Sequence, residues 1–404
     1  MKILMVNKFL YPKGGAETYT IKLGENLKKQ GHKVQYFGME ESKNTVFNQY
    51  NLYVKKLDLT KNNIKSILNV YKLIYSNEAK NKMKKILNLY KPDLIILNNI
   101  EYHLTPSVIV AIGRYKERIN KNARVYYVAH DYQLICPSHG LFDYNLNICE
   151  KCLGGNYWNC YQTKCLKGSK LKSLIGSIDS IYWHKKKIYR YIDKIICPSQ
   201  FMKNKLDTLK EFKEKTIVIR NFVDDEIIKG YKKENYIIYF GKLCKDKGLE
   251  TLLKVVRNLK NIKFVFAGYG PLEQEIEKNE NAIWVGFKTG NELKELIAKA
   301  KISIYPSEWY ENCPFSVIES QMYGTPVIGS NIGGIPELIG VGKSGEVFEA
   351  GNSNDLEYKL LKLWNDEKLL EKYSENCKYI EVETIEKYIE KLLKIYEGGY
   401  NENY

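Results

Sequence analysis

The sequence predicts an α/β fold made of two doubly wound domains, each a parallel sheet covered by helices. Strand-like apolar runs alternate with helix-like segments along the chain, which is typical of parallel sheets with crossover helices. The series of strands restarts near residue 236, and 404 residues exceed what one ordinary core accommodates. Two domains that face each other across a cleft are therefore expected.

Six strands are expected in the first half of the chain. Each candidate is a short run rich in Ile, Leu, Val and Tyr, and the candidates are 2–7, 33–37, 93–98, 124–130, 194–197 and 216–220. Between the first two, a helix is expected to begin after "KGGAET" (13–18). Its end is expected at "GH" (31–32), because glycine is a natural stop for a helix.

A second series of strands is expected at 236–241, 262–268, 282–286, 301–307 and 325–330. The polar span 221–236 separates the two series and is the predicted boundary. It divides the chain into an N-terminal domain (1–221), which carries a cysteine-containing insertion at about 136–180, and a C-terminal domain (222–384). In the remaining segment (385–404), "IEKYIEKLLKIYEG" is predicted to form an amphipathic helix that glycine ends.

Composition indicates a globular protein, with 44% hydrophobic and 27% charged residues. No segment approaches 18 uncharged apolar residues, so a membrane-spanning helix is not expected. The first ten residues, "MKILMVNKFL", lack a small-residue cleavage site and are interpreted as a strand, not a signal peptide. A cytoplasmic location is the resulting expectation.

The formal net charge of +16 calls for an explanation. Lysine-rich stretches at 81–91, 183–191 and 212–216 can attract anionic lipid at the inner face of the plasma membrane. The alternative is that they are plain solvated faces. Nucleic acid is not expected as a partner, because there is no zinc finger, ribonucleoprotein-type aromatic motif or long basic arm.

Candidate functional residues are sought just after the strands, because open α/β sheets bind ligands beyond the carboxyl ends of their strands. Gly14 and Gly15 follow the first strand, where paired glycines let backbone approach a ligand and the next helix offers free amides to an anion. The alternative is a turn that needs positive φ. The segment is not the G-x-G-x-x-G dinucleotide motif, which counts against an NAD enzyme.

Two further strand ends carry side chains suited to chemistry. His130 and Asp131 end the fourth strand, where the carboxylate can orient and polarise the imidazole; a satisfied histidine at a domain rim is the alternative. Lys242 and Lys247 lie in "GKLCKDKG" (241–248), where two ammonium groups can neutralise a diphosphate unless they are ordinary surface lysines. Gly241 opens this loop, and "AGYGPLE" (267–273) and "WVGF" (284–287) are similar turns with weaker signals.

"ENCPFSVIES" (311–320) places two glutamates eight positions apart. Pro314 suits the first turn of a helix that Gly324 would stop, so Glu311 is predicted in a loop and Glu319 on the helix. Between the glutamates lies a helix amino terminus that can accept a phosphate, with unpaired amides expected at Phe315, Ser316 and Val317. The alternative is an acidic residue near a helix start for dipole reasons.

Four of the nine cysteines form "CEKCLGGNYWNCYQTKC" (149–165). The C-x2-C and C-x4-C pairs can supply a tetrahedral zinc site, although the spacer between them is short. Free thiols that pack an insertion and redox-sensitive pairs are the alternatives, since disulfides are disfavoured in a reducing compartment. The candidate ligands are Cys149, Cys152, Cys160 and Cys165.

Taken in order, these motifs resemble the retaining glycosyltransferase family 4, whose members have the GT-B fold. The motifs are "GGAE" (14–17), "HD" (130–131), "GKL…KG" (241–248), "G-x-G-P" (268–271) and "PSEWYENCPFSVIESQMYGTPVIGSNIGGIPELI" (306–339). The resemblance covers most of the chain and is strongest from about 236 to 345, including the E-x7-E element at Glu311 and Glu319. The cysteine insertion resembles one in family members that build bacterial surface polysaccharides.

The resemblance implies a role for each matching residue. Gly14 and Gly15 would approach the donor phosphates, His130 would lie near the transferred sugar, and Lys242 and Lys247 would stabilise the diphosphate. Lys242 departs from the family, which usually has arginine there. Glu311 would contact sugar hydroxyls, Glu319 the ribose, and the amides of 315–317 a phosphate. The turn with Gly286 and Phe287 would border the base, and the terminal helix would return to the N-terminal domain.

The resemblance thus implies retaining transfer of a sugar from a nucleotide-diphosphate donor, UDP- or GDP-linked, to a saccharide or lipid-linked saccharide. A cofactor is not expected, since no D-x-D metal-binding pair lies beside a nucleotide loop. Two rival functions stay open at this point: a nucleotide-sugar epimerase of the same fold, and a non-catalytic nucleotide-sugar-binding protein at the membrane surface.

Overall fold

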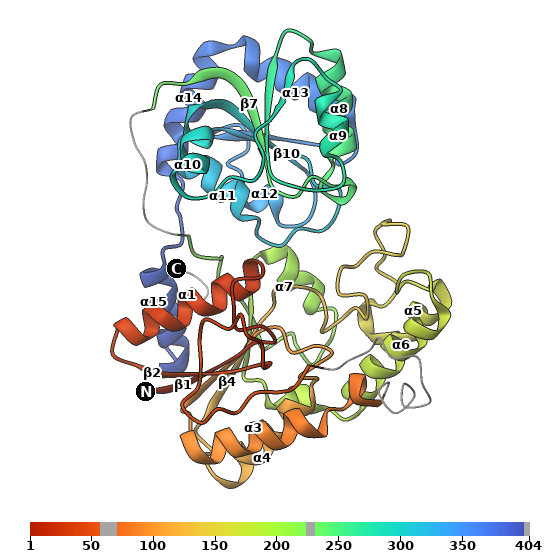
Figure 1. Cartoon of the computed structure of the whole chain (residues 1–404), viewed down its shortest axis with the longest axis vertical. Helices are drawn as coiled ribbons and strands as arrows, with labels where there is room; N and C mark the ends of the chain where they lie inside the picture. The colour runs from red at the N-terminus through yellow and green to blue at the C-terminus, as the bar shows by residue number, and fades with distance from the viewer. Residues whose placement is uncertain (57–70, 224–230, 400–404) are drawn as a thin grey trace. The chain divides into compact units, whose positions relative to one another are not determined.

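The computed structural model describes residues 1–56, 71–223 and 231–399, which form two compact α/β units (Figure 1). Unit 1 comprises Met1–Pro198, Lys203–Ile219 and Ile385–Tyr404, and unit 2 comprises Ser199–Met202 and Arg220–Thr384. Part of the predicted boundary segment 221–236, residues 224–230, lies outside the described residues. The short segment 199–202 belongs to unit 2, although the sequence assigned it to the N-terminal domain.

Unit 1 is built on a six-stranded, fully parallel sheet in the order β2-β1-β3-β4-β5-β6. All four residues of its β3, "LIIL", are buried, as expected for a strand covered on both faces. All six strands were predicted from the sequence to within two residues at each end. They are β1 (Lys2–Val6), β2 (Lys33–Phe37), β3 (Leu94–Leu97), β4 (Arg124–Val128), β5 (Lys194–Cys197) and β6 (Thr216–Val218).

The helices of unit 1 include two pairs of neighbours, α1 with α15 and α3 with α4 (Figure 1). Its α-helices are α1 (Gly15–Lys29), α3 (Asn77–Tyr90), α4 (Ser107–Arg118), α5 (Trp158–Thr163), α6 (Lys170–Lys185), α7 (Gln200–Leu206, which begins in unit 2) and α15 (Ile385–Glu397). Two short 3-10 helices are η1 (Leu153–Gly155) and η2 (Ile188–Tyr191).

The start of α1 differs from the prediction. The helix begins at Gly15, so the "GGAET" segment forms its first turn instead of preceding it. Gly14 is the N-terminal cap in an extended conformation, and Glu17 lies in the first turn. A carboxylate at that place is favoured by the positive end of the helix dipole, which explains why a glycine-rich segment still starts a helix.

Unit 2 has a second six-stranded parallel sheet, in the order β12-β11-β10-β7-β8-β9. Five of its strands were predicted. The sixth, "GEVF", has a weak signal because it is short and contains glycine and a charged residue. The strands are β7 (Glu234–Phe240), β8 (Lys263–Ala267), β9 (Ala282–Trp284), β10 (Ala300–Tyr305), β11 (Val327–Ser330) and β12 (Gly345–Phe348).

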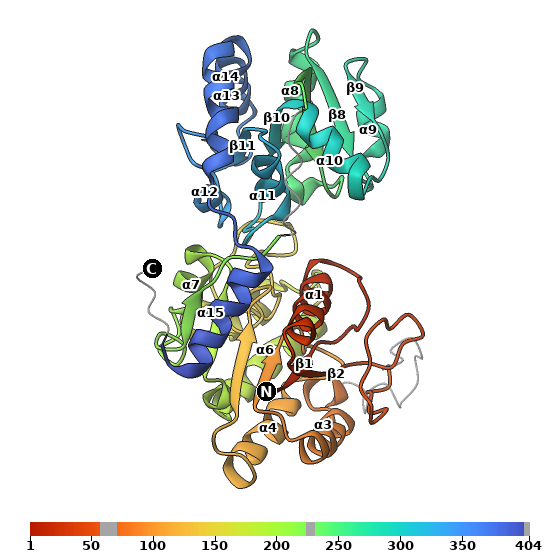
Figure 2. The same ribbon diagram turned by 90° about the vertical axis from the view of Figure 1, so that its left-hand side faces the viewer.

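The helices of unit 2 follow its strands, and α13 lies beside both α8 and α14 (Figure 2). A core cluster joins α8 and α13 to the sheet through residues such as Leu252, Val256 and Leu360. The helices are η3 (Lys245–Lys247), α8 (Leu249–Asn258), α9 (Glu273–Glu277), α10 (Gly290–Lys299), α11 (Phe315–Met322), α12 (Ile335–Leu338), α13 (Ser353–Asn365), α14 (Glu367–Asn376) and η4 (Cys377–Tyr379).

Strand order determines where each sheet can bind a ligand. In unit 2 the chain builds β8 and β9 on one side of β7, then crosses to β10 on the other side. In unit 1 the crossing occurs between β1 and β3. Loops diverge at such a point and leave a crevice beyond the carboxyl ends of the two strands. The loops after β7, β10, β1 and β3 are therefore the places to examine.

Candidate functional site

The loops after β7 and β10 place a lysine against a glutamate. Lys247 ends η3, directly after β7, and its ammonium forms an ion pair with the Oε1 atom of Glu311 in the loop after β10. The two side chains keep only 19% and 13% of their surface exposed. The sequence proposed both residues for the site, and the structure brings them into direct contact at the switch point of the sheet.

Backbone contact between the two loops makes this pair possible. Gly248 has a φ of +71°, and a Cβ atom there would lie 1.7 Å from the carbonyl oxygen of Pro306. Only glycine therefore allows the loop after β7 to approach the loop after β10 so closely. The carbonyl of Asp246 also accepts a hydrogen bond from the backbone N–H of Glu308 at 3.1 Å, which links the loops a second time.

Three neutral donors fix the Glu311 carboxylate. Ser307 donates to its Oε1 atom at 3.1 Å, the indole N–H of Trp309 donates to the same atom, and the buried Tyr305 hydroxyl is also hydrogen-bonded to the carboxylate. The Lys247 ammonium lies 4.6 Å from the centre of the Trp309 ring, a distance that allows a cation–π contact. Sequence reasoning missed these three supporting side chains, although all stand in the segment 305–309 beside Glu311.

A pair of glycines after β11 holds the backbone of Glu311. The N–H of Gly334 donates to the carbonyl of Glu311 at 2.7 Å. Gly333 has a φ of +61°, and a Cβ atom there would lie 2.4 Å from the same carbonyl oxygen. The loop that carries the carboxylate is thus packed against backbone from two other strands.

The amino end of α11 lies at the same edge of the sheet. Pro314 caps the helix in an extended conformation, so it precedes the first turn instead of lying within it. The Ser316 hydroxyl donates to the carbonyl of Phe240, the last residue of β7, at 3.4 Å. Glu319 lies one turn beyond Phe315 on the partly exposed face of α11.

One of the three amides predicted to be unpaired is used within the helix start. The N–H of Val317 donates to the carbonyl of Pro314 at 3.2 Å. The N–H groups of Phe315 and Ser316 donate to no acceptor in the described part of the chain. The expectation for Val317 is therefore wrong, because the extended proline turns its carbonyl back into the first turn.

The turns after β8 and β9 complete this edge of unit 2. Trp284 donates from its indole to the carbonyl of Gly268 at 2.9 Å, and the Gly268 N–H donates to the carbonyl of Gly286 at 2.9 Å. Beyond these turns, the rings of Tyr269 and Phe287 meet edge to face at 5.5 Å, although both residues are at least 60% exposed. An exposed aromatic pair can cover the face of a nucleobase.

Gly241 and Lys242 also lie at this edge, directly after β7, and both are exposed. Their loop is held by the Tyr239 hydroxyl, which donates to the carbonyl of Lys242 at 2.7 Å. The Lys242 ammonium has no ion-pair partner among the described residues, in contrast to Lys247. The two lysines thus differ: one is held by a carboxylate and the other is available to an anion.

His130 of unit 1 is partly buried and neutral. Its Nε2 atom lies 2.9 Å from the Oδ1 atom of Asn98, whose amide nitrogen donates to the carbonyl of Val6 at 3.3 Å. Because the Asn98 oxygen must then be the acceptor, Nε2 carries the proton and Nδ1 is the acceptor of the ring. Burial lowers the pKa of His130 to about 4, so the imidazole is uncharged at neutral pH.

Asp131 does not take the place that the sequence suggested for it. Asn98 is the hydrogen-bond partner that orients His130, whereas Asp131 accepts from the N–H of Gln133 at 2.9 Å and lies 3.9 Å from Nδ1 of His139. Sequence reasoning missed Asn98, although it lies just after β3, where a binding residue was to be sought.

Gly14 and Gly15 lie at the start of α1 in unit 1 and contribute the backbone that follows β1. Four residues after Gly15, the ring of Tyr19 packs edge to face on His130 with centres 5.0 Å apart. Near them, the Lys8 ammonium pairs with the carboxylate of Glu101. The glycine segment, the neutral histidine and this ion pair therefore all lie at the carboxyl-terminal edge of the sheet of unit 1.

The cysteines of the insertion form a largely buried cluster. Cys152, Cys160 and Cys165 pack with Tyr157, and Cys149 lies nearby with partial exposure. Burial raises the pKa of Cys152 to about 12, whereas the hydrogen bond with Cys160 lowers the pKa of Cys165. Among the described residues, no group of three or more His, Cys, Asp or Glu side chains is arranged to hold a metal ion.

The zinc hypothesis therefore stays a prediction for metal analysis. About one equivalent of zinc in a metal-replete preparation would support it, and less than about 0.2 equivalents would contradict it.

None of the helices in the described ranges is long and apolar enough to cross a bilayer.

Comparison with known proteins identifies the family. The model of "Glycosyltransferase Family 4" matches residues 13–227, and that of "Glycosyl transferases group 1" matches residues 223–379. An uncharacterized glycosyltransferase of Methanocaldococcus jannaschii is 28% identical over 328 residues, which are 74% of this chain and 91% of that protein. The O-antigen chain mannosyltransferase C of Escherichia coli is 24% identical over 225 residues, 51% of this chain and 60% of that protein.

Solved structures show the same fold. The structure of Anabaena HepE in complex with UDP superposes with a TM-score of 0.68 at 16% sequence identity, covering 98% of this chain and 100% of that one. Its likeness, with the two parallel sheets, confirms the predicted GT-B fold. Because the first family model spans more than half of the chain, this protein belongs to glycosyltransferase family 4.

Proposed function

We propose that this glycosyltransferase moves a sugar from a nucleotide-diphosphate donor to a saccharide or lipid-linked saccharide, with retention of anomeric configuration. The observation that carries the proposal is the largely buried Lys247–Glu311 pair at the switch point of unit 2, beside the amino end of α11. Cation, carboxylate and free amides at one sheet edge match the diphosphate and hydroxyl groups of such a donor.

The donor diphosphate is the leaving group, and its negative charge grows as the bond to the sugar breaks. Lys242, Lys247 and the N–H groups of Phe315 and Ser316 are the groups that would receive this charge. Fixed donors of this kind contribute roughly 2–4 kcal/mol each to transition-state stabilisation. The exposed Lys242 can bind a phosphate without losing a partner, whereas Lys247 keeps Glu311 close to the phosphate end of the donor.

The carboxylates of Glu311 and Glu319 would then accept hydrogen bonds from hydroxyl groups of the donor. Ser307, Trp309 and Lys247 all contact one oxygen atom of Glu311, Oε1, and the carboxylate is proposed to accept a further hydrogen bond from a sugar hydroxyl. Glu319, one turn into α11, is proposed to bind the ribose. The turn at Gly286, with the exposed rings of Phe287 and Tyr269, is proposed to border the base.

In unit 1, Gly14, Gly15 and His130 are proposed to act on the same donor. The glycines would approach the phosphates, and the neutral His130 would lie near the transferred sugar as a hydrogen-bonding group, not as a cation. Proton transfer through a cofactor or metal is not part of the proposal. A divalent metal is expected to be dispensable, because the lysines and amides supply the positive charge at the diphosphate.

Similar proteins support the choice of substrates. HepE was solved in complex with UDP, and one relative is an O-antigen chain mannosyltransferase. A UDP- or GDP-sugar donor and an acceptor used in bacterial surface polysaccharide synthesis are therefore proposed. The net charge of +16 supports a place at an anionic membrane surface, where a lipid-linked acceptor would be met.

A thermal-shift screen over UDP-, GDP- and ADP-sugars tests the donor. A donor at 100 times its dissociation constant adds about 2.7 kcal/mol of stability, which is easily seen as a shift in Tm. NMR of the product from the selected donor then gives the anomeric configuration. An inverted product would refute retention, and conversion of the donor into another sugar nucleotide without acceptor would indicate an epimerase instead.

A further inference from the structure

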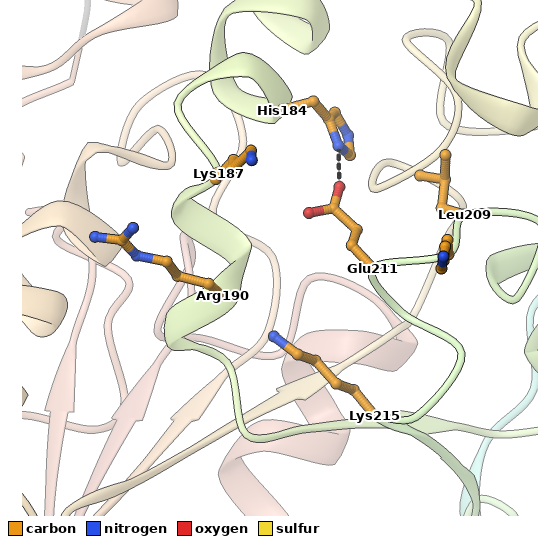
Figure 3. A pocket seen from close by; sticks show the side chains of 7 residues that line it. His184, Lys187, Arg190, Leu209, Glu211 and Lys215 are labelled. Atoms are coloured by element: carbon orange, nitrogen blue, oxygen red, sulfur yellow. Dashed lines mark hydrogen bonds and ion pairs between the residues drawn. The ribbon is translucent and has the colours of Figure 1, made fainter.

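Two of the three lysine-rich stretches of the sequence meet around one cavity of unit 1. The cavity has a volume of about 550 Å³ and lies between the end of α6, η2 and the loop that follows α7 (Figure 3). One wall comes from stretch 183–191 and the other from residues 209–215, which overlap stretch 212–216. Its lining residues are His184, Lys187, Arg190, Leu209, Lys210, Glu211 and Lys215.

The cations of this cavity are poorly neutralised. In the described part of the chain, no carboxylate lies within ion-pair distance of Lys187, Lys210 or Lys215. The Lys215 ammonium donates to the backbone carbonyl of Tyr189 at 2.9 Å, and burial lowers its pKa below the usual value. At the rim, Arg190 is exposed and lies 3.9 Å from an exposed carboxylate, that of Glu117.

Glu211 is the one carboxylate of the lining, and it is engaged by the histidine. Nδ1 of His184 lies 2.5 Å from Oε1 of Glu211, the contact drawn as a dashed line in Figure 3. On the other side of the ring, Nε2 lies 2.8 Å from the hydroxyl of Tyr157 and 3.0 Å from the carbonyl of Leu134. The His184–Glu211 pair therefore links the two walls of the cavity. Four cations against one carboxylate leave the lining with an excess of three positive charges.

The cavity is separate from the donor site proposed above. Lys215 directly precedes β6, and η2 leads into β5, so the lining lies where these strands begin. The ligand edge of a doubly wound sheet is at the carboxyl ends of its strands, where His130 and Gly14 lie. An excess of three positive charges in a cavity of this size suits a group with two or three negative charges better than a single carboxylate.

We propose that this cavity is a binding site for a phosphomonoester or diphosphate group, held by Lys187, Lys210 and Lys215 with Arg190 at the rim. The group can belong to an anionic lipid headgroup or to a soluble phosphorylated molecule. The two sources share the same chemistry, and the experiment below separates them. The proposal does not depend on sugar transfer, because no residue of the cavity belongs to the proposed donor site.

Lysine acetylation read residue by residue by mass spectrometry tests the proposal in the full-length protein. Pyrophosphate should slow the acetylation of Lys187 and Lys210 at least about fivefold while leaving Lys84 and Lys85 unchanged. Those two lysines are exposed on α3, within the lysine-rich stretch 81–91, and have no ion-pair partner among the described residues. Equal rates with and without pyrophosphate at Lys187 and Lys210 would overturn the proposal. Pyrophosphate bound at the donor site would not produce this protection, because acetylation is measured separately at each lysine.

Matched variants test the same site by affinity. Lys187→Gln with Lys210→Gln removes two charges from the cavity, and Lys84→Gln with Lys85→Gln removes two from α3. Both pairs are compared in a Lys247→Ala background, which weakens binding at the donor site. The cavity pair should weaken pyrophosphate binding by at least about 30-fold, since each charge-assisted contact is worth tenfold or more. Equal affinities of the two double variants would contradict the proposal.

Vesicles identify the source of the phosphate. Cosedimentation with vesicles that contain phosphatidic acid, lost in the cavity variant and kept in the α3 variant, would assign a lipid headgroup. Protection by pyrophosphate without a difference between the variants on vesicles would assign a soluble phosphorylated ligand. Loss of cosedimentation to the same extent in both variants, with no pyrophosphate protection, would mean general surface charge and would refute the site.

Discussion

Lys247 and Glu311 act on each other before any substrate is present. Their ion pair is largely buried, and removal of one partner from such a pair usually leaves a costly charge. Here Ser307 and Trp309 remain on Glu311 if the lysine is lost, and these contacts soften the cost. A mutation of Lys247 is therefore expected to impair the candidate site without unfolding the protein.

Lys247→Ala and Glu319→Ala should each lower kcat/KM for sugar transfer roughly 30- to 1000-fold, the equivalent of 2–4 kcal/mol of lost transition-state stabilisation. Circular dichroism should show that both variants remain folded. Lys245→Ala is the matched control, because Lys245 lies in the same 3-10 helix and forms only an exposed pair with Glu250 at 3.4 Å. Wild-type turnover in both folded site variants would overturn the site assignment.

His130 should make unit 1 sensitive to acid. Its pKa is about 4 in the folded protein and about 6.5 in an unfolded chain, so only the unfolded chain takes up this proton between those values. The stabilising contribution is complete above pH 6.5 and is lost as the pH falls towards 4, by roughly 3 kcal/mol in total.

Comparison of the wild type with His130→Gln measures this contribution of His130 to the free energy of unfolding. Urea unfolding between pH 4.5 and 7.5 should show a shallower fall in the free energy of unfolding for the variant, because glutamine does not titrate. His32→Gln serves as control, since burial lowers the pKa of His32 less than that of His130 and most of the slope should stay in place. An identical slope in wild type and His130→Gln would show that His130 does not stay neutral in the folded state.

At the scale of elements, loops from three strands hold the site together. The approach of the β7 loop to the β10 loop needs Gly248, and the approach of the β11 loop to Glu311 needs Gly333. These glycines lie outside the residues that would touch the donor. Their effect on catalysis should therefore come from the positions of the loops that carry Lys247 and Glu311.

Gly333→Ala should lower turnover at least about tenfold, because its Cβ atom would lie 2.4 Å from the Glu311 carbonyl oxygen and must displace that loop. Gly342→Ala is the matched control: Gly342 also has a positive φ, +74°, but a Cβ atom there meets nothing within 4 Å. Both variants should lose about 1 kcal/mol of stability from the left-handed backbone. If Gly333→Ala kept the turnover of Gly342→Ala, the loop contact would not matter for catalysis.

At the scale of the whole molecule, the end of the chain completes unit 1. Helix α15 packs beside α1 and buries Tyr388, Ile389 and Leu392, and the hydroxyl of Tyr388 is hydrogen-bonded to that of Tyr19 at 2.5 Å. Tyr19 in turn packs on His130. The last helix therefore supports a candidate site residue more than 250 positions earlier in the chain.

Leu392→Ala should lower the free energy of unfolding of unit 1 by about 2–5 kcal/mol, because Leu392 is fully buried and its loss leaves a cavity. Leu89→Ala, on the 58% exposed Leu89 of α3, should change it by less than about 0.5 kcal/mol. Thermal or urea unfolding gives both values. Equal effects would mean that α15 contributes little to the stability of unit 1.

The sequence by itself determined the strands and the residues that follow them. Apolar runs such as "LIIL" indicate burial on both faces of a sheet, and this local signal located eleven of the twelve strands in the described part of the chain. Because parallel sheets bind ligands at the carboxyl ends of their strands, the same signal also directed attention to His130, Lys247 and Glu311. The early start of α1 and the strand β12 were missed, since glycine-rich or charged segments carry weak local signals.

Only the tertiary structure decided which of these residues act together. Lys247 and Glu311 are 64 positions apart, and they meet because β7 and β10 are neighbours in the sheet. Asn98 in place of Asp131 orients His130 for the same reason, since β3 and β4 are paired. The basic cavity likewise needs segments that precede β5 and β6 to come together. Contacts of this kind depend on strand order, which local sequence patterns do not encode.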